Sequence, residues 1–239
     1  MNETGTAFII CGQDSILDTF ARYMQNRFKN ITIYRAYEGS YNALSALYRN
    51  QVQAVAAHLW DGETSEYNTP FAKIMLPGIH STVINICYRV QGFYVAKDNP
   101  KNITGWEDLK RDDISIINRE AGSGSRVLLD NHLKLLGIEQ ATVAGYYNES
   151  LSPAAIATKI AGKSADIGIS TEKQLLHSNE LTFIPLQRER YDLIIRNEGR
   201  FKEHIKATIE ILKSESFKDA IGDIYGYDFS DTGKIVGET

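Results

Sequence analysis

The chain has only two cysteines in 239 residues, Cys11 and Cys87. Each lies inside an apolar run, residues 7–11 and 83–88, and neither takes part in a metal-ligand spacing. This scarcity excludes a cysteine-based metal centre. Apolar surroundings of this kind are typical of free thiols that pack as small core residues. We therefore expect two buried, reduced thiols in neighbouring strands.

The chain also lacks an excess of basic residues and any long apolar run. Its 26 Lys and Arg against 30 Asp and Glu give a formal net charge of -4. Nucleic acids and anionic membranes need a basic face, so we expect neither as a partner. No stretch approaches the ~18–20 apolar residues of a membrane span, and the first residues lack the features of a signal peptide. We expect a cytoplasmic protein, or an extracellular or periplasmic one if a signal peptide was removed.

Two common enzyme signatures are missing as well. Residues 121–125 lack the glycine two positions after the serine of a Gly-x-Ser-x-Gly elbow, and no Walker-type lysine follows them. We therefore expect a non-catalytic protein without a cofactor. The alternative is an enzyme in which His58, Glu149 or Asp166 acts as acid or base on a small organic acid or phosphate-like metabolite.

What the sequence does contain is an alternation of short apolar strands and amphipathic helices, which predicts an α/β fold with mainly parallel sheets. Runs 83–88 and 92–96 read as two separate strands, and 60–70 reads as a surface loop. The chain is expected to cross twice between two lobes. We assign residues 1–88 plus 192–239 to the first lobe and 89–191 to the second.

The most informative segment is 116–126, where an apolar strand runs into a glycine-serine turn and then a helix. Such a turn exposes backbone N–H groups at a helix N-terminus, where the peptide dipoles favour negative charge. Serine hydroxyls add donors, and arginine adds fixed charge. The candidate oxyanion-binding residues of this segment are Arg119, Gly122, Ser123, Gly124, Ser125 and Arg126. The alternative is an ordinary tight turn with a serine cap.

Five further residues are candidates for the ligand site. Ser40 begins another strand-to-helix turn, where it offers a hydroxyl to a ligand or caps its helix. Asp14 either caps a helix or faces the ligand. If it faces the ligand, its carboxylate would accept a proton from phosphate. If it caps the helix, molybdate stays favoured. His58 ends an apolar strand, as a structural residue or a ligand-site residue. Asp166 either lines the site or binds neighbouring amides, and Tyr67 offers apolar contact to an organic acid.

Nine stretches of the chain resemble a known family in one continuous order. They are residues 12–14, 39–44, 57–61, 66–70, 89–92, 118–126, 162–168, 189–193 and 226–228. The chain resembles the periplasmic-binding-protein-like domain of molybdate-related binding proteins, which is also fused to helix-turn-helix regulators. The resemblance implies a two-lobed type 2 solute-binding fold, with two crossover strands and a ligand in the central cleft.

The same resemblance implies a function and possible partners. The ligand would be a small tetrahedral oxyanion, with molybdate or tungstate favoured, and the partner would be an ABC transporter or a DNA-binding regulator domain. Ser125 stands where the family usually has threonine, which keeps the hydroxyl. Pro153 stands where the family usually has histidine, which removes one side chain from the site.

Overall fold

The computed structural model describes residues 7–173, 179–222 and 224–239, and the chain divides into two compact units. Unit 1 comprises Met1–Tyr88, Arg190–Ile224 and Asp228–Thr239, and unit 2 comprises Arg89–Glu189 and Tyr225–Tyr227. This division differs from the one expected from the sequence at residues 190, 191 and 225–227. Each unit is an α/β structure.

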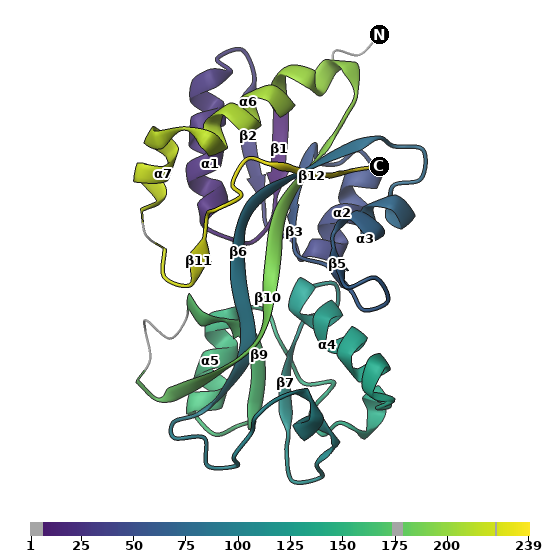
Figure 1. Cartoon of the computed structure of the whole chain (residues 1–239), viewed down its shortest axis with the longest axis vertical. Coiled ribbons are helices and arrows are strands. Elements are labelled where there is room, and N and C mark those ends of the chain that lie inside the picture. The colour runs from purple at the N-terminus through teal and green to yellow at the C-terminus, as the bar shows by residue number, and fades with distance from the viewer. Residues whose placement is uncertain (1–6, 174–178, 223) are drawn as a thin grey trace. The chain divides into compact units, whose positions relative to one another are not determined.

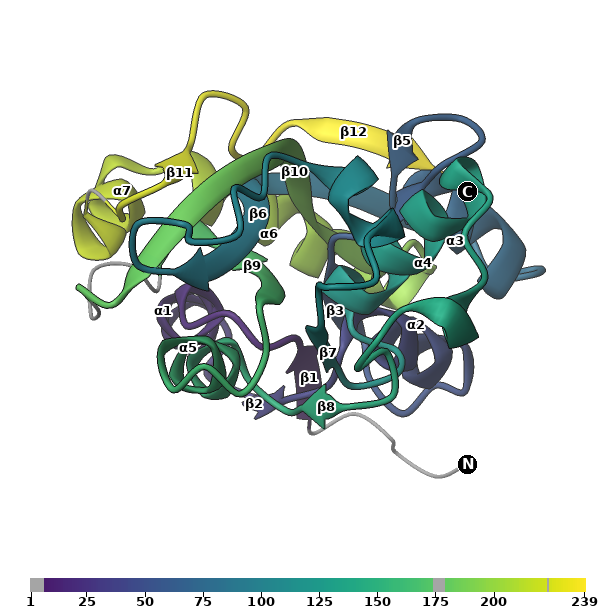
Figure 2. The same cartoon turned by 90° about the horizontal axis from the view of Figure 1, so that it is seen from below.

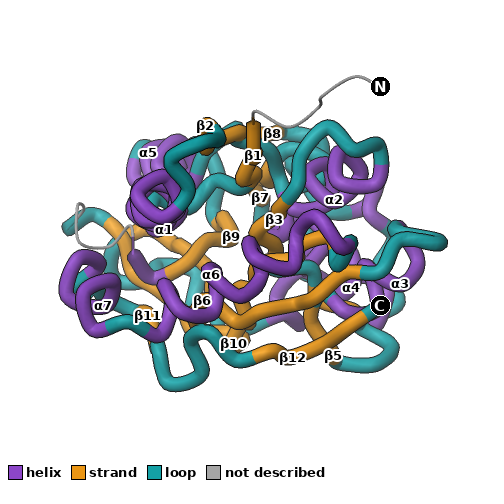
Figure 3. The backbone as a smooth tube through the Cα atoms, turned by 90° about the horizontal axis from the view of Figure 1, so that it is seen from above, coloured by secondary structure: helices purple, strands orange, loops and turns teal. Residues whose placement is uncertain are grey.

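Unit 1 contains three short parallel strands in the order β2-β1-β3. Helix α1 lies on one side of them and α2 with α3 on the other, while α6 and α7 pack on α1 (Figures 1 and 3). The bounds are β1 Ala7–Cys11, α1 Ile16–Arg27, β2 Thr32–Ala36, α2 Ser40–Tyr48, β3 Ala54–Ala57, β4 Trp60–Asp61, β5 Glu66–Tyr67, α3 Thr69–Met75, a short 3-10 helix Gly199–Phe201, α6 Lys202–Lys213, α7 Glu215–Ile221, β11 Tyr227–Asp228 and β12 Ile235–Glu238. Strand β11 spans the boundary between the two units.

Unit 2 is built on β7 and β9, which are parallel, with α4 and α5 on opposite faces (Figures 1 and 2). Its elements are a 3-10 helix Trp106–Lys110, β7 Ile116–Arg119, α4 Gly124–Leu136, a 3-10 helix Gln140–Thr142, β8 Glu149–Ser150, α5 Pro153–Ala161 and β9 Ile167–Thr171. Helix α5 packs closely on β9, because a Cβ at Gly168 would lie only 2.3 Å from the Ile156 side chain.

Two strands of 16 residues, β6 Ser81–Ala96 and β10 Leu181–Arg196, run through both units (Figure 1). The prediction of two separate strands at 83–88 and 92–96 is therefore wrong. Polar residues Arg89 and Gln91 suggested a turn there, but in the strand both side chains are buried and have polar partners. The long strands also make the sheet mixed, since β10 is antiparallel to β3 and β6 is antiparallel to β9.

The helix signals of the sequence are confirmed where a local side chain or backbone angle sets the boundary. Ser152 caps α5 by accepting the Ala155 amide hydrogen at 3.2 Å, with Pro153 as the first helical residue. Gly137 ends α4 in the left-handed region, at a φ of 66°.

Two other expectations need correction. The segment 60–70 is not simply a surface loop: Trp60 and Tyr67 pair in the β4–β5 ladder, and both side chains are buried. Cys11 and Cys87 are buried and form no disulfide, as expected, but their strands are not neighbours. The strand order places β3 and β10 between β1 and β6.

Candidate functional site

The turn between β7 and α4 in unit 2 has the geometry of a capped helix start. Gly122 has a φ of 88°, in the left-handed region that favours glycine. Ser123 follows as the cap, and its hydroxyl oxygen accepts the Arg126 amide hydrogen at 3.3 Å. Gly124 and Ser125 are then the first two helical residues. Their N–H groups lie at the position where an α-helix provides no internal acceptor.

Three serine hydroxyls lie near the carboxyl ends of β7 and β9. Ser123 is 2% exposed and Ser125 is 5% exposed. Ser170, near the end of β9, is 2% exposed, and its hydroxyl has no hydrogen-bond partner among the residues that the structure describes. Parallel strands end at the same edge of a sheet, so all three hydroxyls belong to one edge of unit 2. Ser170 was not a candidate from the sequence, because a serine late in an apolar strand carries no local signal.

The Arg119 guanidinium has protein partners within unit 2. It donates to both carboxylate oxygens of Glu120, each at 2.7 Å, and to the Leu151 carbonyl at 3.4 Å. A planar fork that meets both oxygens of a carboxylate is the strongest common arrangement for arginine. The positive charge of Arg119 beside the turn is therefore balanced by the carboxylate of Glu120.

The Arg126 guanidinium is also paired within unit 2. It donates to Glu149 at 3.0 Å, to Asp130 at 3.3 Å and to the Tyr146 hydroxyl at 3.2 Å, and it lies 4.2 Å from the centre of the Tyr146 ring. Burial alone would lower the pKa of Arg126, but the Tyr146 hydrogen bond and the Asp130 charge outweigh it and raise the pKa. Burial and the bond to Asp130 raise the pKa of Tyr146 to about 12. Arg126 thus remains a cation that is held by its own unit.

Asp166 lies at the other end of the unit 2 sheet. It directly precedes β9, whereas the glycine-serine turn follows the parallel strand β7. Its carboxylate accepts the Ser115 amide and hydroxyl hydrogens, both at 2.8 Å, and pairs with Lys101 at 2.9 Å. Burial would raise the pKa of Asp166, but these bonds outweigh it and lower the pKa. The structure therefore does not bring Asp166 together with Ser123 and Ser125.

In unit 1 the structure brings Ser40, His58 and Tyr191 together. Gly39, not Ser40, is the cap of α2, so of the two roles left open for Ser40 the helix cap is not the one observed. The Ser40 hydroxyl instead accepts the His58 amide hydrogen at 3.3 Å. The His58 ring meets the Tyr191 ring edge-on, with the centroids 6.0 Å apart. A Cβ at Gly12 would lie 3.3 Å from the Tyr191 hydroxyl, so the end of β1 belongs to the same group.

Asp14 lies one residue before Ser15, which is the cap of α1. Its carboxylate accepts the Ile16 amide hydrogen at 3.0 Å, at the first residue of α1. The Tyr67 backbone carbonyl accepts a hydrogen bond from the Arg190 guanidinium at 2.7 Å. The Asp14 contact uses an oxygen of the carboxylate that the sequence offered to a ligand, whereas the Tyr67 contact uses only the backbone.

A buried polar network in unit 1 was not among the sequence candidates. The Asp192 carboxylate is fully buried and accepts from Arg190 at 2.8 Å, Asn68 at 2.8 Å and Asn85 at 3.2 Å. Burial raises the pKa of Asp192 despite these partners. Asn68 also bonds to the backbone of Ala57, so the network fixes the end of β3, next to His58. Its members are far apart in sequence, and no local pattern reveals it.

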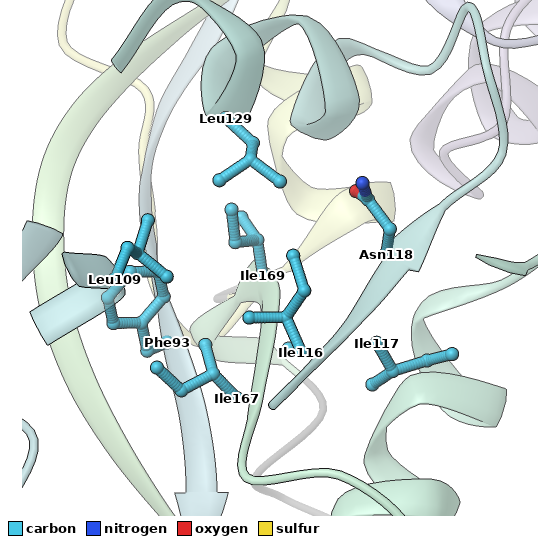
Figure 4. Close-up of a pocket in the computed structure, with 9 residues that line it drawn as sticks. Phe93, Leu109, Ile116, Ile117, Asn118, Leu129, Ile167 and Ile169 are labelled. Carbon is cyan, nitrogen blue, oxygen red and sulfur yellow. The ribbon is translucent and has the colours of Figure 1, made fainter. Parts of the chain in front are cut away.

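The cavity of Figure 4 is part of the core of unit 2 and does not suit an anion. It lies among β7, β9 and α4, and its volume of about 10 Å³ has room for one water molecule at most. Its lining is apolar apart from Asn118. The Asn118 amide nitrogen already donates to the Tyr146 carbonyl, at 3.2 Å.

Among the described residues, no group of three or more His, Cys, Asp or Glu side chains could hold a metal ion. Within the same part of the chain, no helix is both long and apolar enough to cross a membrane.

Comparison with known proteins decides the family. A family model described as the PBP superfamily domain matches residues 21–213. The chain belongs to the PBP superfamily. This membership confirms the expected two-lobed α/β fold of the periplasmic-binding-protein-like type. The regulator-fused molybdate family remains a finer prediction.

One relative is the Bacillus subtilis (strain 168) protein YvgK, which is 42% identical over 231 residues. The match covers 97% of this chain and 74% of YvgK. A second relative comes from Clostridium pasteurianum and is named for its place in the 5' region of a 2Fe-2S ferredoxin gene. It is 43% identical over 112 residues, and the match covers 47% of this chain and 99% of the relative.

Solved structures with this fold include binding proteins of transporters. One is a Clostridium perfringens protein assigned as a phosphate ABC transporter substrate-binding protein, with phosphate bound. It is 14% identical with a TM-score of 0.63, and the match covers 93% of this chain and 99% of that protein's chain. A Clostridium difficile protein assigned as the substrate-binding domain of a molybdenum ABC transporter is 14% identical with a TM-score of 0.53, covering 94% and 99%. At such low identity the likeness concerns the fold.

Proposed function

We propose that this chain is a non-catalytic binding protein for a small tetrahedral oxyanion, with molybdate or tungstate as the favoured ligand. The observation that carries the proposal is the start of α4. There the amides of Gly124 and Ser125 lie beyond the reach of helical acceptors, next to the buried Ser123 and Ser125 hydroxyls. The backbone and hydroxyl donors hold the anion, and the helix dipole favours its charge.

The paired arginines refine this proposal. Arg119 and Arg126 both have carboxylate partners in unit 2, so the anion is held mainly by uncharged donors. Hydrogen bonds to a charged group contribute ~1.5–3 kcal/mol each. Four or five such bonds are enough to offset desolvation and reach micromolar binding or better. An acidic chain can therefore bind an anion without a basic patch.

The position of Asp14 favours a fully ionised ligand. A carboxylate beside the anion would repel molybdate and would accept a hydrogen from phosphate. The Asp14 carboxylate accepts instead from the Ile16 amide, at the first residue of α1. By this criterion molybdate and tungstate are ahead of phosphate. The interlobe cleft expected from the sequence, with Ser40 as a donor, stays a prediction.

The enzyme alternative is less well supported by the contacts of its candidate groups. Glu149 is paired with Arg126, and Asp166 is held by Ser115 and Lys101. His58 lies in unit 1 against Tyr191. A general acid or base needs hydrogen-bond reach to the reacting atom, and both carboxylates are already paired with cations of their own unit.

Partner and compartment follow from the choice between transport and sensing. The two structural relatives named above are assigned to ABC transporters, which supports a transporter as partner. A DNA-binding regulator domain is the second proposal, and it would place the chain in the cytoplasm. Transport would place it outside the membrane. In either role the protein needs no cofactor.

Isothermal titration calorimetry with molybdate, tungstate, sulfate and phosphate tests the proposal. We expect micromolar or tighter binding of molybdate and tungstate. A Ser125→Ala variant should weaken that binding, while its thermal midpoint stays near that of the wild type. Absence of heat with all four anions would overturn the ligand class, and binding of small carboxylic acids alone would favour the organic-acid alternative, with Trp60 and Tyr67 as apolar contacts.

A further inference from the structure

Four buried polar side chains form a continuous row in unit 2, and the row ends at the proposed anion site. Arg89 on β6 forms an ion pair with Glu189 on β10. The other Glu189 oxygen accepts from the Gln91 amide nitrogen at 2.8 Å. The Gln91 amide oxygen accepts from the Ser125 hydroxyl at 3.4 Å. The exposed fractions are 6% for Arg89 and 1% each for Glu189 and Gln91, with Ser125 at 5%.

The chemistry of these groups fixes the direction of every hydrogen bond in the row. Arginine always carries its proton, and a carboxylate paired with it offers only lone pairs. Gln91 must therefore turn its NH₂ group to Glu189, which leaves its oxygen facing Ser125. Since a serine hydroxyl has one hydrogen, the Ser125 hydrogen points at Gln91. Toward a ligand on its other side, the Ser125 oxygen then offers lone pairs.

We propose that Gln91, held by Glu189 and Arg89, determines the specificity of the site by setting whether Ser125 donates or accepts. This inference rests on the proposed function. A phosphate ion, which keeps a hydrogen at neutral pH, can donate it to the Ser125 oxygen. Molybdate and sulfate have none, so they must draw the Ser125 hydrogen away from Gln91 and leave that amide oxygen without its donor. The row therefore shifts the preference of the site toward anions that carry a hydrogen, whichever anion binds most tightly overall.

The Gln91→Met substitution tests the inference, because it removes the amide at similar length and leaves the Arg89–Glu189 pair. The readout is the ratio of the phosphate and molybdate dissociation constants, measured by calorimetry at pH 7.5. We expect the ratio to shift about fivefold to tenfold in favour of molybdate, the effect of one hydrogen bond. A merely structural role for Gln91 would change both affinities alike and leave the ratio unchanged, which would overturn the proposal.

Two further variants separate the possible failures. In a Ser125→Ala background the Gln91→Met change should leave the ratio unaltered, because no hydroxyl remains to be directed. Glu189→Gln frees the Gln91 amide to turn over, so it should shift the ratio in the same direction even if Gln91→Met does not fold. If the wild-type chain binds none of the anions, the proposed function itself fails. If it binds them and no variant changes the ratio, only the role of the row fails.

Discussion

The Ser123 hydroxyl accepts the amide hydrogen of Arg126, at 3.3 Å, and so caps α4 from within the turn. This contact provides an acceptor for the Arg126 amide. The amides of Gly124 and Ser125, which precede Arg126 in the helix, have no acceptor within the helix. The serine cap and the anion site, which the sequence presents as alternatives, are therefore compatible. One hydroxyl shapes the helix start, and the amides before it are available to a ligand.

The pairing of Arg126 leads to a prediction that separates charge from backbone donors. Arg126→Gln should lower the free energy of unfolding by about 1–2 kcal/mol, because Glu149 and Asp130 lose a cation but remain partly hydrated. Their side chains are 40% and 32% exposed. Urea denaturation measures the loss. Molybdate affinity should change less than about threefold, or under about 1 kcal/mol.

Glu149→Gln is the matched control, since it removes the partner and keeps Arg126. It should also destabilise the chain and leave anion affinity unaltered. A loss of affinity well beyond tenfold in Arg126→Gln alone would mean that the guanidinium contacts the anion directly.

His204 gives unit 1 a pH-dependent stability. Its ring is stacked between Phe8 and Phe28, at centroid distances of 4.7 Å and 4.4 Å, and burial lowers its pKa from 6.5. The unfolded chain then binds a proton that the folded chain does not, so stability is present above pH 6.5 and is lost as the pH falls below it. His204→Phe keeps the stacking and should flatten the dependence of unfolding free energy on pH below pH 6.5.

Part of the slope should remain in that variant. Burial also lowers the pKa of His132 in unit 2, against the opposing effect of its bond to Gln187. An unaltered slope in His204→Phe would show that His204 protonates equally well in the folded and unfolded chains.

Gly168 is a site where a single methyl group should destabilise unit 2. A Cβ there would lie 2.3 Å from the Ile156 side chain, so that side chain, α5 or β9 must shift. Gly168→Ala should lower the free energy of unfolding by about 1–3 kcal/mol. Gly199→Ala is the control, because nothing lies within 4 Å of its Cβ position, and it should change stability by less than about 0.5 kcal/mol. Equal effects in the two variants would contradict the close packing of α5.

Features that depend on neighbouring residues could be predicted from the sequence, whereas features that depend on distant residues could not. The caps at Ser152 and Gly137 could be predicted, because a side-chain acceptor and a left-handed φ are properties of neighbouring residues. The continuity of β6 could not, since the partner that allows Gln91 inside a strand is Glu189, 98 residues away. Strand alternation was enough for the α/β class, whereas the antiparallel pairings depend on the long strands.

The candidate site divides in the same way. The glycine-serine turn was visible as a pattern, and its positive φ at Gly122 and its cap at Ser123 follow from local chemistry. The partner of Arg126 was not visible, because Glu149 approaches from a different strand. The sequence left Asp166 open as a site residue or as a partner of neighbouring amides, and strand direction places it at the other end of the sheet.

The most direct test of the account compares Gly124→Pro with Gly124→Ala in molybdate titrations. Position 124 is the first of α4, where proline is tolerated, and the extended backbone of Ser123 suits a following proline. Both variants add a Cβ, but only proline removes the N–H. The account predicts that Gly124→Pro binds molybdate at least about tenfold more weakly than Gly124→Ala at a similar thermal midpoint. Equal affinities in the two variants would contradict it.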